Sequence, residues 1–165
     1  KLIRSRSRNM RKSYIDWPTY FMGIAYLSAM RSKDPKTQVG ACIVNSKKRI
    51  VGIGYNGFPY GCSDESFPWG KSEELIESKH AYVVHAELNA ILNAQGDISD
   101  CELYVTHFPC HECAKAIIQS GIKKVYYASN ERTEKETTKA AQKMFKAAKI
   151  TYDKLDEFKV EIKKS

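Results

Sequence analysis

Two short segments of this chain together carry three good zinc ligands and one carboxylate: 85–87, which reads His-Ala-Glu, and 109–113, which reads Pro-Cys-His-Glu-Cys. Two residues separate Cys110 from Cys113, a spacing that lets two sulfurs hold one small tetrahedral ion. Each segment opens an apolar run at helical spacing that ends near a glycine. We therefore expect two helix N-termini to meet at one metal ion.

The number of ligands indicates which kind of zinc site this is. Structural sites complete the tetrahedron with four protein groups, whereas catalytic sites leave one position for water. His85, Cys110 and Cys113 supply three groups, and Glu87 is better placed to move protons to and from that water than to bind the metal. A fourth ligand from Cys62, Cys101, His107 or His111 would instead make a structural site. The ligand count favours the catalytic alternative.

The other cysteines are expected to be ordinary residues of the fold. Cys42 and Cys101 lie in strand-like runs, where a free cysteine behaves as a small core residue. The five cysteines form no regular framework, which argues against disulfides and for a reducing compartment.

Composition bounds the class of protein. The chain has 165 residues, of which 42% are hydrophobic and 28% charged, as in one globular domain. It contains no apolar run of about 18 residues and no secretory leader pattern, so we expect no membrane association and a cytoplasmic protein.

Net charge is concentrated at one end of the chain. The formal net charge is +8, yet residues 1–12 hold six basic side chains and no acid. Subtracting these six from 27 leaves 21 basic against 19 acidic side chains in residues 13–165. We expect 1–12 to be a basic leader, disordered or derived from an expression vector rather than a functional arm, and 13–165 to be a single domain. The near-neutral body argues against a nucleic-acid partner.

The order of the expected elements predicts the fold class. Helices are expected at 17–32, 85–95, 110–120 and 134–148, and strands at 39–45, 49–55, 101–106, 122–128 and 149–152. The first two strands form a hairpin, and 56–79 is a long loop with a possible short helix at 73–78. Alternating helices and strands in the second half imply parallel pairing. We predict a three-layer α/β/α sandwich with a mixed sheet of about five strands.

At these residues the chain resembles the cytidine deaminase superfamily, and within it the deoxycytidylate (dCMP) deaminase branch. The stretches that carry the resemblance are the zinc motif, 17–22 (Trp-Pro-Thr-Tyr-Phe-Met), 31–35 (Arg-Ser-Lys-Asp-Pro), 39–45, 52–59 (Gly-Ile-Gly-Tyr-Asn-Gly-Phe-Pro) and 85–91. The resemblance implies a cytidine deaminase-like fold and zinc-dependent hydrolysis of dCMP to dUMP and ammonia, a step that supplies dUMP for thymidylate synthesis.

The resemblance also implies roles for particular residues. His85, Cys110 and Cys113 would hold one zinc ion, and Glu87 would protonate the ring and help ammonia leave. The residues that would contact the substrate are Asn45 and Ala86, with Arg31, Ser32 and Lys33 as candidates for the 5′-phosphate. The alternative for these three is a solvated helix end.

Regulation and assembly are likewise implied only by the resemblance. Asn56, Gly57 and Asp16 would bind dCTP as activator and dTTP as inhibitor, with Mg²⁺ accompanying the nucleotide, and the chain would form a homohexamer. The alternative for the Asn56-Gly57 pair is a simple turn. Alternative functions are a bifunctional dCMP/dCTP deaminase, a deaminase of tRNA or single-stranded DNA, and a non-catalytic zinc-stabilised binding protein.

Overall fold

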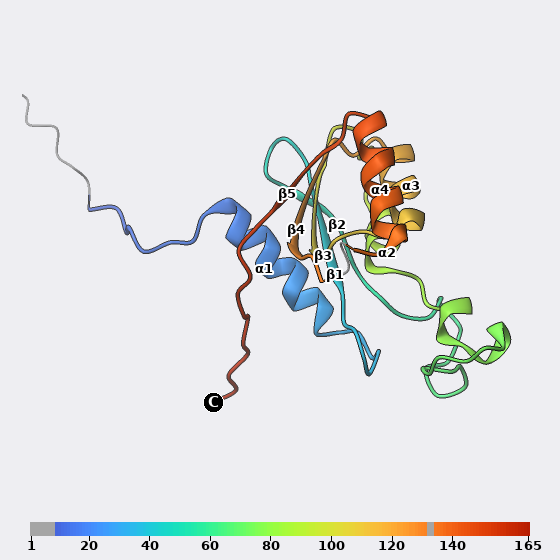
Figure 1. Ribbon diagram of the computed structural model, residues 1–165. Helices are drawn as coiled ribbons and strands as arrows, with labels where there is room; N and C mark the ends of the chain where they lie inside the picture. Colours follow the sequence, from blue (N-terminus) through green and yellow to red (C-terminus); the bar gives the residue numbers. More distant parts are fainter. Residues whose placement is uncertain (1–8, 132–133) are drawn as a thin grey trace, which may run out of the picture.

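The computed structural model describes residues 9–131 and 134–165, and within them a five-stranded sheet is covered by helices on both faces (Figure 1). The strand order is β2-β1-β3-β4-β5, with bounds Ile50–Tyr55, Gly40–Val44, Glu102–His107, Lys124–Ser129 and Thr151–Lys154. The helices are α1 (Trp17–Ala29), α2 (Ala86–Leu92), α3 (His111–Gln119) and α4 (Glu136–Ala147). The predicted fold class is confirmed. The predicted basic leader lies largely outside the described residues, which begin at residue 9.

The sheet is mixed, as the order of elements predicted. β1 pairs antiparallel with both β2 and β3, whereas β3–β4 and β4–β5 are parallel pairs joined by helical crossovers. Leu103 of β3 lies opposite Ile43 on one side and Val125 on the other. The parallel half therefore aims the C-terminal ends of β3 and β4 at one edge of the sheet, where α3 begins.

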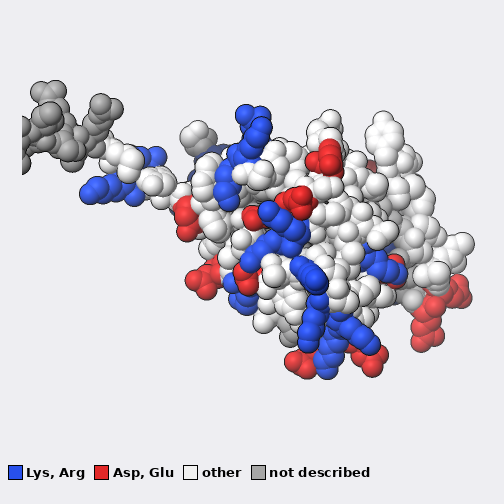
Figure 2. All heavy atoms as spheres, turned by 90° about the horizontal axis from the view of Figure 1, so that it is seen from above, with Lys and Arg blue, Asp and Glu red and all other residues white. Residues whose placement is uncertain are grey.

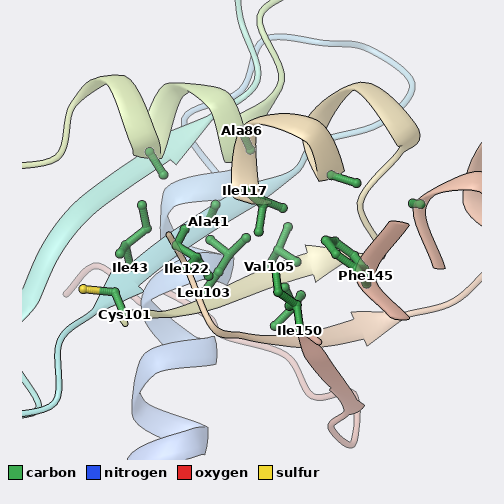
Figure 3. Close-up of a cluster of buried hydrophobic side chains, with 14 of the residues drawn as sticks. Ala41, Ile43, Ala86, Cys101, Leu103, Val105, Ile117, Ile122, Phe145 and Ile150 are labelled. Atoms are coloured by element: carbon green, nitrogen blue, oxygen red, sulfur yellow. The ribbon is translucent and has the colours of Figure 1, made fainter. Parts of the chain in front are cut away.

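Alternation along the central strands builds two separate cores. Side chains of one parity, such as Ile43 and Leu103, face α2, α3 and α4 and join the larger buried cluster (Figure 3). Side chains of the other parity, such as Tyr104, face α1 with Phe21 and Met22. Because successive residues of a strand point to opposite faces, the central strands are apolar at nearly every position.

The helix and strand ends depart from the predicted bounds by a few residues. α1 ends at Ala29 rather than near 32, because Arg31 and Ser32 form a turn ahead of the Asp34-Pro35 step. A short 3₁₀ turn, η1 (Leu75–Glu77), lies within the short helix expected at 73–78, and a second, η2 (Lys79–Ala81), follows that range. The segment 158–162 forms neither helix nor strand, and its Phe158 ring packs edge-on against Tyr26 of α1.

The long segment between β2 and α2 is a closed excursion with an interior of its own. Gly57 and Val84 exchange two backbone hydrogen bonds of 3.1 and 2.8 Å and form its neck. Its four packed rings are Phe58, Phe67, Trp69 and Tyr82. We call residues 58–83 the excursion loop, and Figure 1 shows it extending from the sheet beyond α2.

Two glycines of β2 allow α2 to pack directly on the strand. A Cβ atom at Gly54 would lie 2.3 Å from the backbone nitrogen of Ala90 and 2.4 Å from the backbone oxygen of Ala86, both in α2. At Gly52 it would lie 2.6 Å from the oxygen of Ala90. Both glycines therefore admit a helix backbone at close range.

We therefore predict that Gly54→Ala is destabilising, because the added methyl must push α2 away from the sheet. The expected loss is about 1–3 kcal/mol in the free energy of unfolding, measured by urea denaturation. Gly70→Ala is the matched control, since a Cβ there meets no atom within 4 Å. Equal stability of the two variants would contradict this account of the helix–strand contact.

Candidate metal centre and pocket

The first ligand group stands at the start of α2. His85 is the N-cap residue of this seven-residue helix, and Glu87 lies in its first turn. The close packing on Gly52 and Gly54 fixes the helix against the sheet. His85 and Glu87 are therefore held by backbone packing on the edge strand β2.

The other two ligand groups stand at the start of α3. β3 ends at His107, and Cys110 is the N-cap residue of α3, with Cys113 one turn into the helix. The sulfur atoms of Cys110 and Cys113 lie 3.5 and 3.4 Å from Nδ1 of His85. The three ligand atoms all lie within 4.8 Å of one another. The two predicted helix N-termini do meet.

These distances fit a tetrahedral zinc ion. With Zn–S near 2.3 Å and Zn–N near 2.0 Å, the nitrogen and sulfur ligands of a tetrahedral ion are about 3.5 Å apart. The described residues offer no fourth protein ligand to this group, so three groups would hold the ion and leave a position for a small molecule. All five cysteines are free, which agrees with the expectation of no disulfides.

Electrostatics prepare the two sulfurs for a cation. The hydrogen bond with Cys113, together with those from His85, outweighs burial and lowers the pKa of the Cys110 thiol to about 3. The same sulfur pair, followed by burial and the nearby Glu87 charge, raises the pKa of Cys113. One thiolate beside a thiol that gives up its proton on metal binding is a donor set suited to zinc.

Glu87 is the carboxylate of the site and is enclosed. Glu87 is 5% exposed, and one of its carboxylate oxygens lies 3.5 Å from the Cys113 sulfur. Burial raises the pKa of Glu87 above its ordinary value, against the opposing charge of His85. A carboxylate with a raised pKa is a better proton acceptor than an ordinary carboxylate, which suits a group that moves protons.

A cavity of about 520 Å³ opens at this centre. Its walls come from the segment before β1, the excursion loop, the starts of α2 and α3, and the start of α4. Lining residues that bear on the argument are Asp34, Lys36, Asn56, Lys71, Lys79, His80, His85, Ala86, Glu87, Cys110 and Lys135. A volume of this size suits one small-molecule ligand.

The predicted substrate residues are divided by the structure. Ala86 is fully buried at the first turn of α2 and lines the cavity. Asn45 does not line it: this residue follows β1 at the end opposite the metal centre, where its side chain accepts hydrogen bonds from Lys47 and Arg49 and shapes the hairpin. The structure therefore does not bring Asn45 to the metal centre within one chain, because β1 and β3 run antiparallel.

The three phosphate candidates also lie outside the cavity lining. Arg31 stands 6.0 Å from the ring centre of Tyr55, and the Ser32 hydroxyl donates to the backbone oxygen of Asn56. Lys33 pairs with Asp64 of the excursion loop. These residues follow the end of α1. Two of them contact Tyr55, the last residue of β2, and Asn56, the residue after it.

Asn56 lies inside the cavity rather than on a separate surface. It is 6% exposed, its side-chain oxygen accepts from Val39 N at 2.8 Å, and its amide donates to Thr37 O at 2.9 Å. Gly57 belongs to the neck of the excursion loop. Asp16 caps the far end of α1, about 20 Å away along the helix axis. One chain therefore does not bring Asp16 to the Asn56-Gly57 turn.

Several cavity residues gave no signal in the sequence. Lys71 and Lys79 come from the excursion loop and Lys135 from the start of α4, and each reads as one more lysine in a basic chain. Asp34 belongs to the Arg-Ser-Lys-Asp-Pro segment, in which the sequence analysis singled out only the first three residues, as candidates for the phosphate. Their shared position depends on contacts distant in sequence.

Comparison with known proteins agrees with this geometry. The model of the cytidine and deoxycytidylate deaminase zinc-binding region matches residues 15–129. The deoxycytidylate deaminases of Mus musculus and Homo sapiens are 54% and 53% identical over 146 residues, which is 87% of this chain and 82% of each relative. The crystal structure of dCMP deaminase from the cyanophage S-TIM5, in complex with dCMP and dUMP, is 29% identical with a TM-score of 0.66. The alignment covers 82% of this chain and 94% of the cyanophage chain.

We predict about one zinc per chain, lost in Cys113→Ser, because two protein ligands hold the ion far more weakly than three. Metal analysis of the purified variant checks this, and thermal unfolding should shift down with the metal, since binding adds to folding stability. Cys62→Ser is the control and should keep its zinc, as Cys62 is outside the ligand group. Full zinc in Cys113→Ser would remove this residue from the centre.

Proposed function

This chain belongs to the cytidine and deoxycytidylate deaminase family, and we propose that it hydrolyses dCMP to dUMP and ammonia. The observation that carries the proposal is the buried Glu87 beside the His85, Cys110 and Cys113 group, at the floor of a cavity of nucleotide size. Curated relatives that share more than half of their aligned residues bear the same activity in their names.

In this mechanism the chain's own groups move the protons. His85, Cys110 and Cys113 would hold a zinc ion, which would supply a Lewis acid that makes water nucleophilic at neutral pH. The Glu87 carboxylate takes a proton from the attacking water and gives it to N3 of the cytosine ring. Glu87 then takes the proton of the new C4 hydroxyl and passes it to the amino group, and as the C4–N bond breaks and the carbonyl forms, ammonia departs. Enclosure of Glu87 keeps these transfers away from bulk water.

The cavity lining supports a phosphorylated substrate. Lys36, Lys71 and Lys135 line it from three different segments, and a phosphate dianion needs cationic partners. The proposal therefore assigns the 5′-phosphate to these lysines, in place of Arg31, Ser32 and Lys33. Two hydrogen bonds hold the Asn56 side chain in the cavity wall, which supports a role for that residue at the sugar, in place of Asn45.

Regulation and assembly form the further part of the proposal. We propose that dCTP activates and dTTP inhibits a homohexameric cytoplasmic enzyme, and that Mg²⁺ accompanies the nucleotide. The surface formed by Arg31 and Tyr55 supports this, because a guanidinium over an aromatic ring offers both charge and a stacking face. Ser32 links that surface to the backbone of Asn56, whose side chain lines the cavity. The described residues contain no helix long and apolar enough to cross a membrane.

The mixed surface charge gives less support to a nucleic-acid substrate than a uniformly basic face would. On the face drawn in Figure 2, Lys and Arg side chains gather along the middle of the domain with Asp and Glu side chains next to them, so this face carries both signs of charge.

Glu87→Gln should abolish deamination while zinc stays bound, because an amide cannot exchange a proton with water and the ring. General acid–base catalysis alone is worth about 10²- to 10⁴-fold, measured here as ammonia release from dCMP. Glu112→Gln is the control: Glu112 is an exposed carboxylate paired with Lys115. Turnover by Glu87→Gln within tenfold of the unmutated protein would exclude Glu87 from the proton transfers.

A panel of cytosine compounds tests substrate and regulation together. Deoxycytidine should be a poor substrate beside dCMP, because it leaves a site built for phosphate unpaired. Added dCTP should shift the dCMP saturation curve to lower concentration and dTTP should oppose it. Equal rates for deoxycytidine and dCMP would contradict the phosphate site, a response to neither triphosphate would contradict regulation, and consumption of dCTP would indicate a bifunctional enzyme.

A further inference from the structure

Asp34 and Lys79 form a buried ion pair in the wall of the metal cavity. The Lys79 ammonium lies 2.6 Å from one carboxylate oxygen of Asp34 and 2.9 Å from the other. Their side chains are 3% and 9% exposed. Taking two charges out of water is costly, and a buried pair seldom adds net stability over apolar residues of equal size. The mechanism above gives this pair no task.

Asp34 organises the segment between α1 and β1. The same oxygen that accepts from Lys79 also accepts from the backbone N–H groups of Lys36 at 2.8 Å and Thr37 at 3.1 Å. These bonds turn the chain so that Lys36 and Thr37 reach the cavity. The hydrogen bonds outweigh the effect of burial, and the pKa of Asp34 lies below its ordinary value. The residue is therefore a carboxylate at neutral pH.

Lys79 organises the inner part of the excursion loop. Its backbone N–H donates to Gly70 at 2.8 Å, and its backbone oxygen accepts from Tyr82 and Val83. Lys71, next to Gly70, and His80 both line the cavity. One side-chain contact thus joins the two segments that carry Lys36 and Lys71.

The aromatic ring pairs of the excursion loop lie within the loop itself. Its four rings pack against one another within residues 58–83 and so stabilise the interior of the loop. The neck at Gly57 and Val84 fixes where the loop starts and ends. A second ion pair, Lys33 with Asp64, joins the same two segments but is 55% and 39% exposed. Exposed pairs of this kind restrain little.

We propose that the Asp34–Lys79 pair is a positioning device that sets the affinity for the nucleotide by holding the excursion loop in register with the segment before β1. The proposal rests on the proposed function, since the ligand is the same phosphorylated substrate. The pair acts through the lysines it aligns, and it touches no reacting atom. It should therefore govern the KM for dCMP more than kcat.

A double-mutant cycle separates positioning from mere stabilisation. Lys79→Met or Asp34→Asn alone leaves one buried charge unpaired, so each should lower the Tm strongly. The double variant D34N/K79M removes both charges and keeps an amide oxygen at position 34 as acceptor for the backbone, so its Tm should return close to the unmutated value. Its KM for dCMP should stay raised by about tenfold, as misplaced binding groups are costly, with kcat changed less than about threefold.

Two further variants calibrate the cycle. Asp64→Asn breaks the exposed pair between the same segments and should leave KM and Tm unchanged. Lys79→Arg keeps the charge and should fall nearer to the unmutated KM than Lys79→Met. A double variant that regains both Tm and KM would show that the pair is only structural and would overturn the proposal.

Backbone hydrogen exchange tests the same idea without substrate. The amides of Tyr82 and Val83, which donate to Lys79, should exchange faster in D34N/K79M than in the unmutated protein, although the global Tm is equal. Unchanged exchange would overturn the proposal even if the unmutated protein deaminates dCMP. If the unmutated protein does not deaminate dCMP, the proposed function fails, and the exchange result still decides whether the pair aligns the loop.

Discussion

The site depends on one geometric constraint: three ligand atoms from two helix starts must come within about 4 Å of each other to surround a tetrahedral ion. His85 and the two cysteines are 25 and 28 residues apart, and different parts of the sheet position them. α3 starts where β3 ends, so its place follows from the strand. α2 has no such connection, and its place follows from two glycines in β2 that let backbone meet backbone. The geometry of the metal centre therefore depends on the contact between α2 and β2.

Burial of Glu87 is a second consequence of that contact. The first turn of α2 carries this carboxylate under the cavity floor, where the low polarity of the surroundings favours its protonated form and raises its pKa. Metal ligation alone would bring charge to the site, but proton transfer needs a group whose two protonation states are close in free energy. The same helix start therefore supplies a ligand and a proton carrier from residues two positions apart.

Local patterns in the sequence were sufficient for the metal centre and the fold class, because ligand spacing, helical periodicity and strand alternation all act over a few residues. Long-range placement was not readable in this way. Asn45 and Asn56 both follow short β-rich runs. Only the antiparallel register shows that Asn56 lies near the metal centre and Asn45 at the opposite end of the strands. Likewise, nothing adjacent to Lys79 indicates that its partner lies 45 residues earlier. Contacts that cross from one segment to another decided which polar residues share the cavity.

The neck of the excursion loop gives this fold an unusual freedom. Because Gly57 and Val84 are hydrogen-bonded neighbours, the chain leaves the sheet and returns to it at a single point. Closing a longer loop at a fixed neck costs only about 0.6 kcal/mol for each doubling of its length. Insertions and deletions between the neck residues can therefore accumulate with little effect on the sheet or the metal ligands. The excursion loop is thus a replaceable module, through which a lineage could change the substrate of the enzyme while inheriting its chemistry intact.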